Sequence, residues 1–367
     1  MNGTGTASPA SLLSASRAST GYAQWADGHW LSFASNQPRI TDQGLLTEQA
    51  ATNLALWCRD LTNANWTPSN VTTALDQTGI DGTANSASSV TATANNGTLT
   101  AAAITSASAS RSVSMFVKRI TGTGAVSISQ DGGSTFTAIT TKVGASWYRP
   151  TTLDFSGLTQ TVTNPQIVIK LGTSGDKIAV DFVDLEAGTF LTSPILTTTA
   201  AATRAADAIT LKSQILNALP VSQGTILASF SLLGYSGLNQ GLVSINDGTA
   251  SNHVDILASY SGGTNTRVLS GGGGSDNGDV IPGAASAGVL YRIGTAWGSN
   301  SLSCVLGSGS IVADATANSP SSISAGLIGR TVYSSTQAFS GTIKRLAFFK
   351  NRMPDSQLKS LVNSGNW

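Results

Sequence analysis

The sequence PRITDQGLLTEQAATNL runs from Pro38 to Leu54, and the sequence TRAAD runs from Thr203 to Asp207. The segment between these two phrases is rich in Thr and Ser, and it contains short stretches in which apolar and polar residues alternate. Alternation with a period of two is typical of β-strands that bury one face. The two phrases therefore bracket a β-rich middle segment and separate it from the start and the end of the chain.

The composition favours an all-β protein. Charged residues make up 11% of the chain, against roughly 25% in an average soluble domain, and the 39 glycines supply many turn positions. Low charge and frequent turn residues favour many short strands, and a length of 367 residues favours two domains. The net charge of +1 gives no field that would gather nucleic acid, so we expect no nucleic-acid partner.

The chain shows no sign of membrane insertion or secretion. No apolar run approaches the roughly 18–20 residues that span a bilayer. Residues 1–10 contain no Lys or Arg and no apolar region follows them, so we expect no signal peptide and folding in a cytoplasm. Cys58 and Cys304 are the only cysteines and fall in different predicted domains, which predicts two buried free thiols.

Residues 1–50 are predicted to form an N-terminal arm. The first nineteen positions are rich in Gly, Thr, Ala and Ser and offer few groups that could build a core, but large aromatics follow at Tyr22, Trp25, Trp30 and Phe33. If such an aromatic patch stays in water, the chain loses a burial free energy of roughly 25 cal/mol per Å² of apolar surface. We expect it to pack either on the first sandwich or on a partner chain, and we assign these four aromatics to assembly and anchoring.

The middle segment, residues 51–200, contains clear strand patterns. Residues 111–118 alternate, and residues 125–139 predict a hairpin around the turn residues Asp131, Gly132 and Gly133. The Ser129-x-Asp131-x-Gly133 pattern resembles the Asp-box, in which the Asp side chain stabilises the turn. Residues 177–185 also alternate, and we predict that one face carries Ile178, Val180, Phe182 and Asp184 and the other Ala179, Asp181, Val183 and Leu185.

The last segment, residues 201–367, reads as a second sandwich. A short helix is predicted at residues 211–219, and strands are predicted at residues 224–233, 253–260, 266–270, 290–297, 301–306 and 341–349. A closing helix is expected between Pro354, which suits a first helical turn, and Gly365, which suits a helix end.

From the end of the phrase at residues 38–54 to the phrase at residues 203–207, shorter phrases follow one another along the chain. They are Thr52-Asn53-Leu54, Trp66, Asp81-Gly82-Thr83, Met115-Phe116-Val117-Lys118, Trp147-Tyr148-Arg149 and Leu185-Glu186-Ala187-Gly188. This order resembles a module of bacteriophage virion proteins and gene transfer particles, although residues 91–109 are shorter and richer in Ala. The resemblance implies two tandem antiparallel β-sandwiches behind the arm. The first, at 51–200, is a carbohydrate-binding-like jelly roll, and the second, at 201–367, is laminin-G/concanavalin-like.

The resemblance also implies a function. It predicts a non-enzymatic virion surface protein, either a head spike or fibre or a tail-associated receptor-binding protein, that attaches the particle to host surface polysaccharide. The implied partners are capsid or tail proteins and further copies of the chain, with a homotrimer favoured. The alternative is a structural adaptor or decoration subunit whose sandwiches make only protein contacts.

The sequence offers weak candidates for catalysis. Glycoside hydrolysis usually needs two carboxylates about 5–9.5 Å apart, and the nearest pattern is Asp181, Asp184 and Glu186, where the last two share a strand face. We interpret this stretch as an ordinary late strand. His253 has no G-x-S-x-G nucleophile turn to serve, and we predict that the protein is not an enzyme.

Aromatic residues near loops and strand edges are the candidates for stacking on sugars: Tyr235, Tyr260, Trp297 and Tyr333. Each also fits a place in the core or at an interface. Asp247, Asp276 and Asp279 lie in Asp/Asn/Gly-rich stretches and are candidate calcium ligands, although the same pattern is typical of turns. No other cofactor is predicted.

Overall fold

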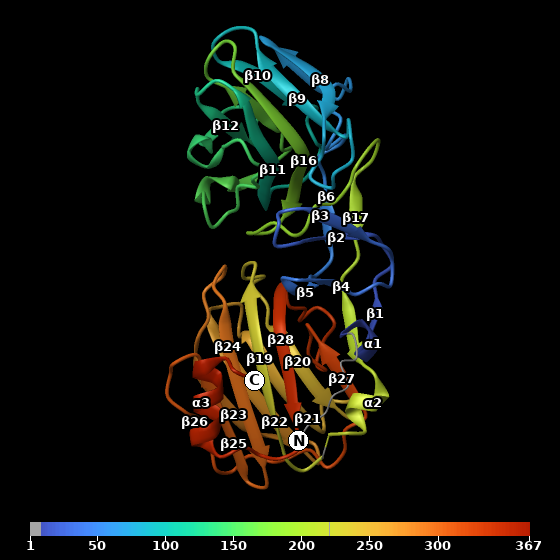
Figure 1. Cartoon of the computed structure of the whole chain (residues 1–367), viewed down its shortest axis with the longest axis vertical. Coiled ribbons are helices and arrows are strands. Elements are labelled where there is room, and N and C mark those ends of the chain that lie inside the picture. The colour runs from blue at the N-terminus through green and yellow to red at the C-terminus, as the bar shows by residue number, and fades with distance from the viewer. Residues whose placement is uncertain (1–8, 220) are drawn as a thin grey trace. The chain divides into compact units, whose positions relative to one another are not determined.

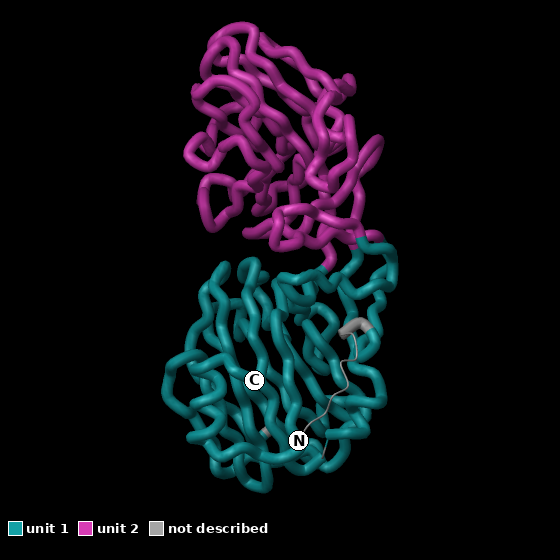
Figure 2. Tube along the Cα trace, viewed as in Figure 1, with its two compact units in different colours: residues 1–19, 33–49, 205–367 teal, residues 20–32, 50–204 magenta. Residues whose placement is uncertain are grey.

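The computed structural model describes residues 9–219 and 221–367, and it divides into two compact units, each rich in β-strands (Figure 1). In the described part, unit 1 combines the residues up to Ser19 with Phe33–Gln49 and Ala205–Trp367, and unit 2 combines Thr20–Ser32 with Ala50–Arg204 (Figure 2). The predicted fold class, all-β with antiparallel sandwiches, is confirmed.

Unit 1 is built from two seven-stranded antiparallel sheets. In spatial order the first contains β1 (Leu13–Ser16), β18 (Ala208–Leu211), β27 (Ala325–Ile328), β20 (Gln240–Asn246), β21 (His253–Ser259), β22 (Asn265–Gly272) and β23 (Ser275–Ala284). The second contains β26 (Val312–Asp314), β25 (Ser301–Leu306), β24 (Tyr291–Gly298), β19 (Gly224–Leu232), β28 (Gly341–Phe349), β5 (Gly44–Thr47) and β4 (Arg39–Thr41).

One apolar core contains side chains from both of these sheets, such as Val254 and Ile256 of β21 and Ile226 and Phe230 of β19. Helix α3 (Asp355–Ser364) covers the other face of β24 and β25 with Leu358 and Val362. It ends at Gly365, whose φ of 68° suits glycine, as predicted. The remaining helices, α1 (Pro9–Leu12) and α2 (Ser213–Leu216), are single turns, and α2 lies in the predicted range.

Unit 2 is a sandwich of two five-stranded antiparallel sheets. One contains β13 (Thr137–Ala138), β12 (Val126–Ser129), β15 (Val168–Leu171), β10 (Gly97–Ala101) and β7 (Trp66–Ser69). The other contains β14 (Thr159–Val162), β11 (Ala109–Thr121), β16 (Lys177–Ala187), β9 (Ala87–Ala92) and β8 (Val71–Gln77). Two small sheets, β17 (Ala202–Arg204) with β6 (Ala51–Asn53) and β2 (Gly21–Gln24) with β3 (Trp30–Phe33), complete the unit with the 3-10 turns Thr140–Lys142 and Ser156–Leu158.

The described part of the N-terminal segment does not form the separate arm that residues 1–50 predict. β1 pairs with β18, and β5 pairs with both β4 and β28, so residues 13–16 and 39–47 extend the two sheets of unit 1. Residues 21–33 instead form the hairpin of unit 2. The sequence did not reveal this because strands of three or four residues carry little periodicity, and their partners lie far away in the chain.

The aromatics of this segment find partners within the same chain. Tyr22 is buried with its ring edge-on to Phe182, at 5.1 Å between centroids, and Trp30 lies edge-on to Phe116 at 5.5 Å. Phe33 is half-buried. The reason for expecting a partner chain therefore applies only to Trp25, which is 36% exposed, and the assembly role of the other three loses its physical basis.

A bulge in β16 corrects the predicted faces of that strand. Ser114 of β11 pairs with Asp184 and Phe116 pairs with Asp181, so Met115 faces two residues of β16. Phe182 adopts a φ of 40°, which few residues other than glycine tolerate. The extra residue shifts the alternation, so the core-facing residues are Ile178, Val180, Val183 and Leu185. Asp181, Asp184 and Glu186 lie together on the opposite face, whereas the sequence alternation separates Asp181 from Asp184.

Two smaller predictions are confirmed. Ser129 and Asp131 organise the turn between β12 and β13, because Asp131 Oδ1 accepts hydrogen bonds from Ser129 Oγ (2.6 Å) and from Thr135 N (2.9 Å). Cys58 and Cys304 are buried free cysteines in different units.

No helix in residues 9–219 and 221–367 has the length and apolar character needed to cross a membrane.

Candidate functional site

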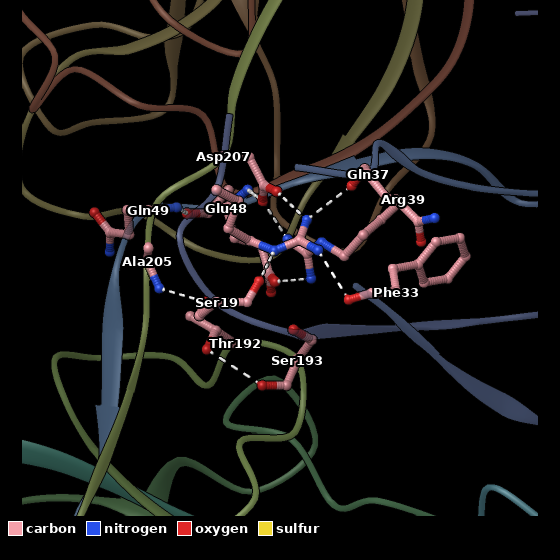
Figure 3. Close-up of polar contacts among 12 residues, drawn as sticks. Ser19, Phe33, Gln37, Arg39, Glu48, Gln49, Thr192, Ser193, Ala205 and Asp207 are labelled. Carbon is pink, nitrogen blue, oxygen red and sulfur yellow. Dashed lines mark hydrogen bonds and ion pairs between the residues drawn. The ribbon is translucent and has the colours of Figure 1, made fainter. Parts of the chain in front are cut away.

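The phrases at residues 38–54 and 203–207 meet in a buried arginine cluster of unit 1 (Figure 3). The cluster is formed by Arg17, Arg39, Glu48 and Asp207. Arg39 Nη1 donates to Glu48 Oε2 (2.6 Å), and Arg39 Nη2 donates to Asp207 Oδ2. All four side chains are fully buried. Burial opposes the charge of Arg39, but the two carboxylates outweigh it and raise the pKa of Arg39.

Backbone groups complete this cluster. Arg17 donates to Asp207 Oδ1 (2.9 Å) and to the carbonyl oxygens of Ser19, Phe33, Ala34 and Gln37. Asp207 Oδ2 accepts from Glu48 N, and Asp207 N donates to Glu48 O, each at 2.9 Å. The buried arginine cluster therefore fixes the N-terminal segment to β18 and its neighbours, and it offers no accessible group to a ligand.

Several other phrases of the resemblance contribute residues, such as Asn53, Asp81 and Arg149, to the surroundings of an acid row in unit 2, formed by Asp181, Asp184 and Glu186 on β16. Arg59 Nε donates to Asp181 Oδ1 (2.7 Å), and Arg59 Nη1 donates to Asp81 Oδ2 (2.8 Å). The guanidinium also stacks on Phe182, at 4.4 Å from the ring centroid. Arg59 thus ties the turn at Asp81-Gly82-Thr83 to the face of β16.

The rest of the acid row is also satisfied internally. Arg149 Nη2 donates to Asp184 Oδ2 (2.6 Å), Asn53 Nδ2 donates to Asp184 Oδ1 (2.7 Å), and Thr192 Oγ1 donates to Glu186 Oε2 (2.8 Å). Desolvation raises the pKa of Asp184 well above its ordinary value, although Arg149 opposes the shift. Asp184 and Glu186 share a face as predicted, but both are buried, so they are not placed to meet a saccharide.

The structure corrects one predicted sugar-stacking residue and gives another a structural role. Trp297 is 1% exposed and lies in the core of unit 1, where it fills the space above Gly224. Tyr235 is half-buried against the same core, and its hydroxyl donates to Ala285 O (2.6 Å) and accepts from Ala287 N (3.1 Å). The core position of Trp297 excludes it as a stacking platform, whereas the Tyr235 hydroxyl is bonded to the backbone of Ala285 and Ala287.

The remaining two tyrosines belong to the face of β21–β23 that points away from the core. Val254, Ile256, Val268 and Val280 of these strands point into the core, so the alternating His253, Asp255, Arg267 and Asp279 point the other way. Tyr260 follows β21 at the end of this face, and Tyr333 contacts it from the loop after β27. We call Tyr260, Arg267, Asp279 and Tyr333 the tyrosine-arginine face.

Arg267 organises this face. Its guanidinium lies 4.2 Å from the centroid of the Tyr260 ring, and it forms a bidentate ion pair with Asp279, with Nε–Oδ1 at 2.8 Å and Nη2–Oδ2 at 2.6 Å. The hydrogen bonds to Asp279 raise the pKa of Arg267, and Tyr260 and Tyr333 add to the effect although burial opposes it. The Asp279 side chain is 47% exposed, so the ion pair is open to solvent.

His253 orients the second tyrosine. The imidazole is buried, with Nδ1 at 3.1 Å from Ala250 O and Nε2 at 2.9 Å from the Tyr333 hydroxyl. A carbonyl only accepts hydrogen bonds, so Nδ1 carries the proton and Nε2 accepts from Tyr333 in the neutral ring. The two rings are also edge-on, at 5.3 Å. Tyr333 is 38% exposed, and His253 holds it in a defined position.

Two of the three candidate calcium ligands make other contacts. Asp247 accepts hydrogen bonds from Thr249, Asn252 and Ser322, and Asp279 is paired with Arg267. Asp276 lies in β23, but its side chain is outside the described residues. Across the described residues, no group of three or more His, Cys, Asp or Glu could hold a metal ion.

Sequence reasoning missed Arg267, both arginines of the buried cluster, and Arg59. Arg267 carried a usable signal, because a single arginine interrupts an otherwise uncharged predicted strand at residues 266–270. The buried arginines could not be recognised, since their acidic partners lie up to 190 residues away along the chain.

The comparisons with known proteins give only distant likenesses. The CBM40 of the Ruminococcus gnavus IT-sialidase is 17% identical and has a TM-score of 0.32, over 39% of this chain and 84% of that chain. The same CBM40 bound to alpha2,3 sialyllactose is 17% identical with a TM-score of 0.33, over 39% and 83%. The mouse laminin alpha1 chain, domains LG4-5, is 9% identical with a TM-score of 0.30, over 71% and 89%. No protein-family model and no curated protein matches the chain.

Proposed function

We propose that this chain is a non-enzymatic virion surface protein that binds host surface polysaccharide through the tyrosine-arginine face of unit 1. The virion assignment is supported by the order of phrases from Pro38 to Asp207, which resembles phage virion modules. The binding role is supported by the geometry of Tyr260, Arg267, Asp279 and Tyr333. Host attachment by a head spike or fibre, or by a tail-associated receptor-binding protein, fits both.

One observation carries the binding role. The tyrosine-arginine face combines aromatic rings with an open, hydrogen-bonding ion pair between Arg267 and Asp279. Sugars present apolar C–H faces, which stack on aromatic rings, and hydroxyl groups, which need fixed donors and acceptors. A partly exposed tyrosine beside an arginine and a carboxylate supplies both kinds of contact.

A hydrolytic role has less support. The acid row of unit 2 is buried, and each carboxylate already accepts hydrogen bonds from Arg59, Arg149 or Thr192. In unit 1 Asp279 is held by Arg267. Glycoside hydrolysis needs one protonated and one ionised carboxyl group on either side of the scissile bond, and these pairings do not supply that arrangement.

We also propose that the protein is made in the host cytoplasm, is displayed on the virion surface next to capsid or tail proteins, and forms a homo-oligomer, with a trimer favoured. Closed cyclic oligomers are the usual solution for spikes and fibres. The exposed Trp25 on the hairpin of unit 2 is the aromatic still available for contacts with another chain. Asp247 and Asp279 already interact within the chain, and we propose that binding does not depend on calcium.

A glycan array probed with the full chain and with Tyr260→Ala and Tyr333→Ala tests the binding role. Loss of one stacking ring costs about 1 kcal/mol or more, so we expect each variant to bind at least about fivefold more weakly. Leu153→Ala is the control, because it removes an exposed apolar side chain from unit 2 and should leave glycan binding unchanged.

One outcome would overturn the binding role, and another would overturn the non-enzymatic assignment. Wild-type protein that binds no glycan but is incorporated into particles would support the structural adaptor instead. Release of reducing sugar from a bound polysaccharide would show an enzyme.

A further inference from the structure

We propose that the tyrosine-arginine face selects neutral saccharides with two adjacent hydroxyl groups and rejects saccharides that carry carboxylates. The inference rests on the proposed glycan-binding function and specifies its ligand class. It follows from how the charge of Arg267 is used within the chain.

The first step is the local charge. An unpaired arginine on a binding face attracts carboxylates, because its planar fork matches their two oxygens. Here that fork is already occupied, since Nε and Nη2 of Arg267 bind both oxygens of Asp279. A second acid lies next to the pair, because Asp314 Oδ2 accepts from Asp279 N (3.3 Å). The surroundings of Arg267 therefore carry an excess of negative charge, which repels an anionic sugar.

The second step is the supply of donors and acceptors. The ion pair uses Nε and Nη2, and among the described residues no hydrogen bond involves Arg267 Nη1, which keeps two N–H groups for a ligand. Asp279 is 47% exposed, and each of its oxygens retains acceptor capacity. One hydroxyl of a vicinal diol can accept from Nη1 while its neighbour donates to Asp279. A neutral sugar supplies this combination, whereas a carboxylate supplies only acceptors.

The third step is the apolar contact. The ring of Tyr333 is exposed, and His253 holds its hydroxyl (2.9 Å). Because that hydroxyl is engaged by a buried group, the ring loses little conformational freedom when a ligand binds. An uncharged pyranose face can stack on this ring next to the polar pair. The arrangement therefore combines stacking with diol recognition.

The test is a change of selectivity in the full-length protein. Binding of dextran, mannan and galactan, which are neutral, is compared with binding of alginate, hyaluronan and polygalacturonate, which carry carboxylates. Wild type should bind at least one neutral polymer and none of the anionic ones. Asp279→Asn keeps the shape but frees the cation of Arg267, so it should weaken neutral binding about tenfold and give measurable binding to the anionic polymers.

Asp76→Asn is the matched control. It makes the same change of charge at a partly exposed ion pair of unit 2, where Asp76 Oδ2 lies 3.5 Å from Lys177 Nζ, and it should not alter selectivity. Arg267→Gln is the second variant. It should weaken the binding of neutral polymers without creating any binding of anionic polymers. This comparison separates the effect of an unpaired Arg267 charge from a general loss of structure.

The outcomes separate the two claims. A wild-type preference for carboxylate-bearing polymers would overturn this inference and leave the glycan-binding function standing. An Asp279→Asn variant that folds normally and keeps the wild-type selectivity would also overturn it. Binding of neither panel by wild type would overturn both claims together.

Discussion

Arg39 and Asp207 are 168 residues apart in the chain, and their side chains form an ion pair with no exposure to solvent. Arg39 lies in the phrase PRIT and Asp207 ends the phrase TRAAD, so this contact explains why the two phrases occur together. Glu48 and Arg17 complete the cluster within hydrogen-bonding distance. The most recognisable part of the sequence therefore determines how unit 1 is assembled, and the proposed ligand-binding residues lie elsewhere.

Arg39→Met should strongly destabilise unit 1. The substitution removes a guanidinium that pairs with both Glu48 and Asp207, whose side chains are fully buried. Removal of one partner from a buried ion pair costs about 3–5 kcal/mol, because the other charge stays without compensation. Urea unfolding followed by tryptophan fluorescence measures the loss. Lys177→Met, at the partly exposed ion pair with Asp76, is the control and should cost less than about 1 kcal/mol. Equal effects in the two variants would contradict the role of the cluster.

Residues 205–367 alone should not fold, because they lack β1, β4 and β5 and the buried Arg17 and Arg39. A chain that joins residues 9–19, 33–49 and 205–367 through short Gly-Ser linkers should be soluble and folded. Such linkers can close both gaps. Arg17 bonds to the carbonyls of Ser19 and Phe33, and Asp207 N lies 2.9 Å from Glu48 O. Circular dichroism and thermal unfolding compare the two fragments, and a stable 205–367 fragment would show that the N-terminal strands are dispensable.

β20 and β23 were missed, but six strands and the closing helix of residues 201–367 were predictable, because their alternation and capping residues are local signals. The interleaving of the N-terminal segment was not. β5 pairs Thr47 with Gly341, and a four-residue strand gives no indication of a partner so far along the chain. The bulge at Phe182 could not be predicted either. An inserted residue leaves the alternation intact on each side of the bulge and changes only which face of the sheet the later residues of the strand occupy.

Acid should remove a defined part of the stability of unit 2. Burial alone raises the pKa of Asp154, but hydrogen bonds from Tyr148 and Thr151 outweigh it and hold the pKa at about 2, below the ordinary value of 3.8. The folded state thus favours the charged form. Its contribution is full above pH 3.8 and is lost as the pH falls through 2. Asp154→Asn should cost about 1 kcal/mol at pH 7, because solvent screens this exposed carboxylate, and little at pH 2, by urea unfolding. A cost independent of pH would contradict this linkage.

The two thiols should be inert in the native protein. Burial raises the pKa of Cys58 to about 12 and also raises the pKa of Cys304, so neither forms the reactive thiolate at neutral pH. A thiol reagent should not react with the native protein. In denaturant, and without any reductant, it should label two thiols per chain. Fast labelling of the native chain would show that one of the units opens readily.

The proposed binding face was only partly predictable from the sequence. Loop and strand-edge positions identified Tyr260 and Tyr333, but the same reasoning selected Trp297, which a core position explains. Position in the sequence does not tell which face of a strand a large aromatic occupies when the register is unknown. Arg267 and Asp279 became meaningful only when β22 and β23 placed them together.

The most direct test of the account uses the six tyrosines of the chain as reporters. The protein is labelled with ¹³C in the tyrosine rings, each resonance is assigned by a Tyr→Phe variant, and a neutral polysaccharide fragment selected on the array is titrated. We expect the resonances of Tyr260 and Tyr333 to shift in parallel and to reach saturation, while the resonances of Tyr22, Tyr148, Tyr235 and Tyr291 do not change. Saturable binding that leaves Tyr260 and Tyr333 unshifted would contradict the tyrosine-arginine face as the glycan site.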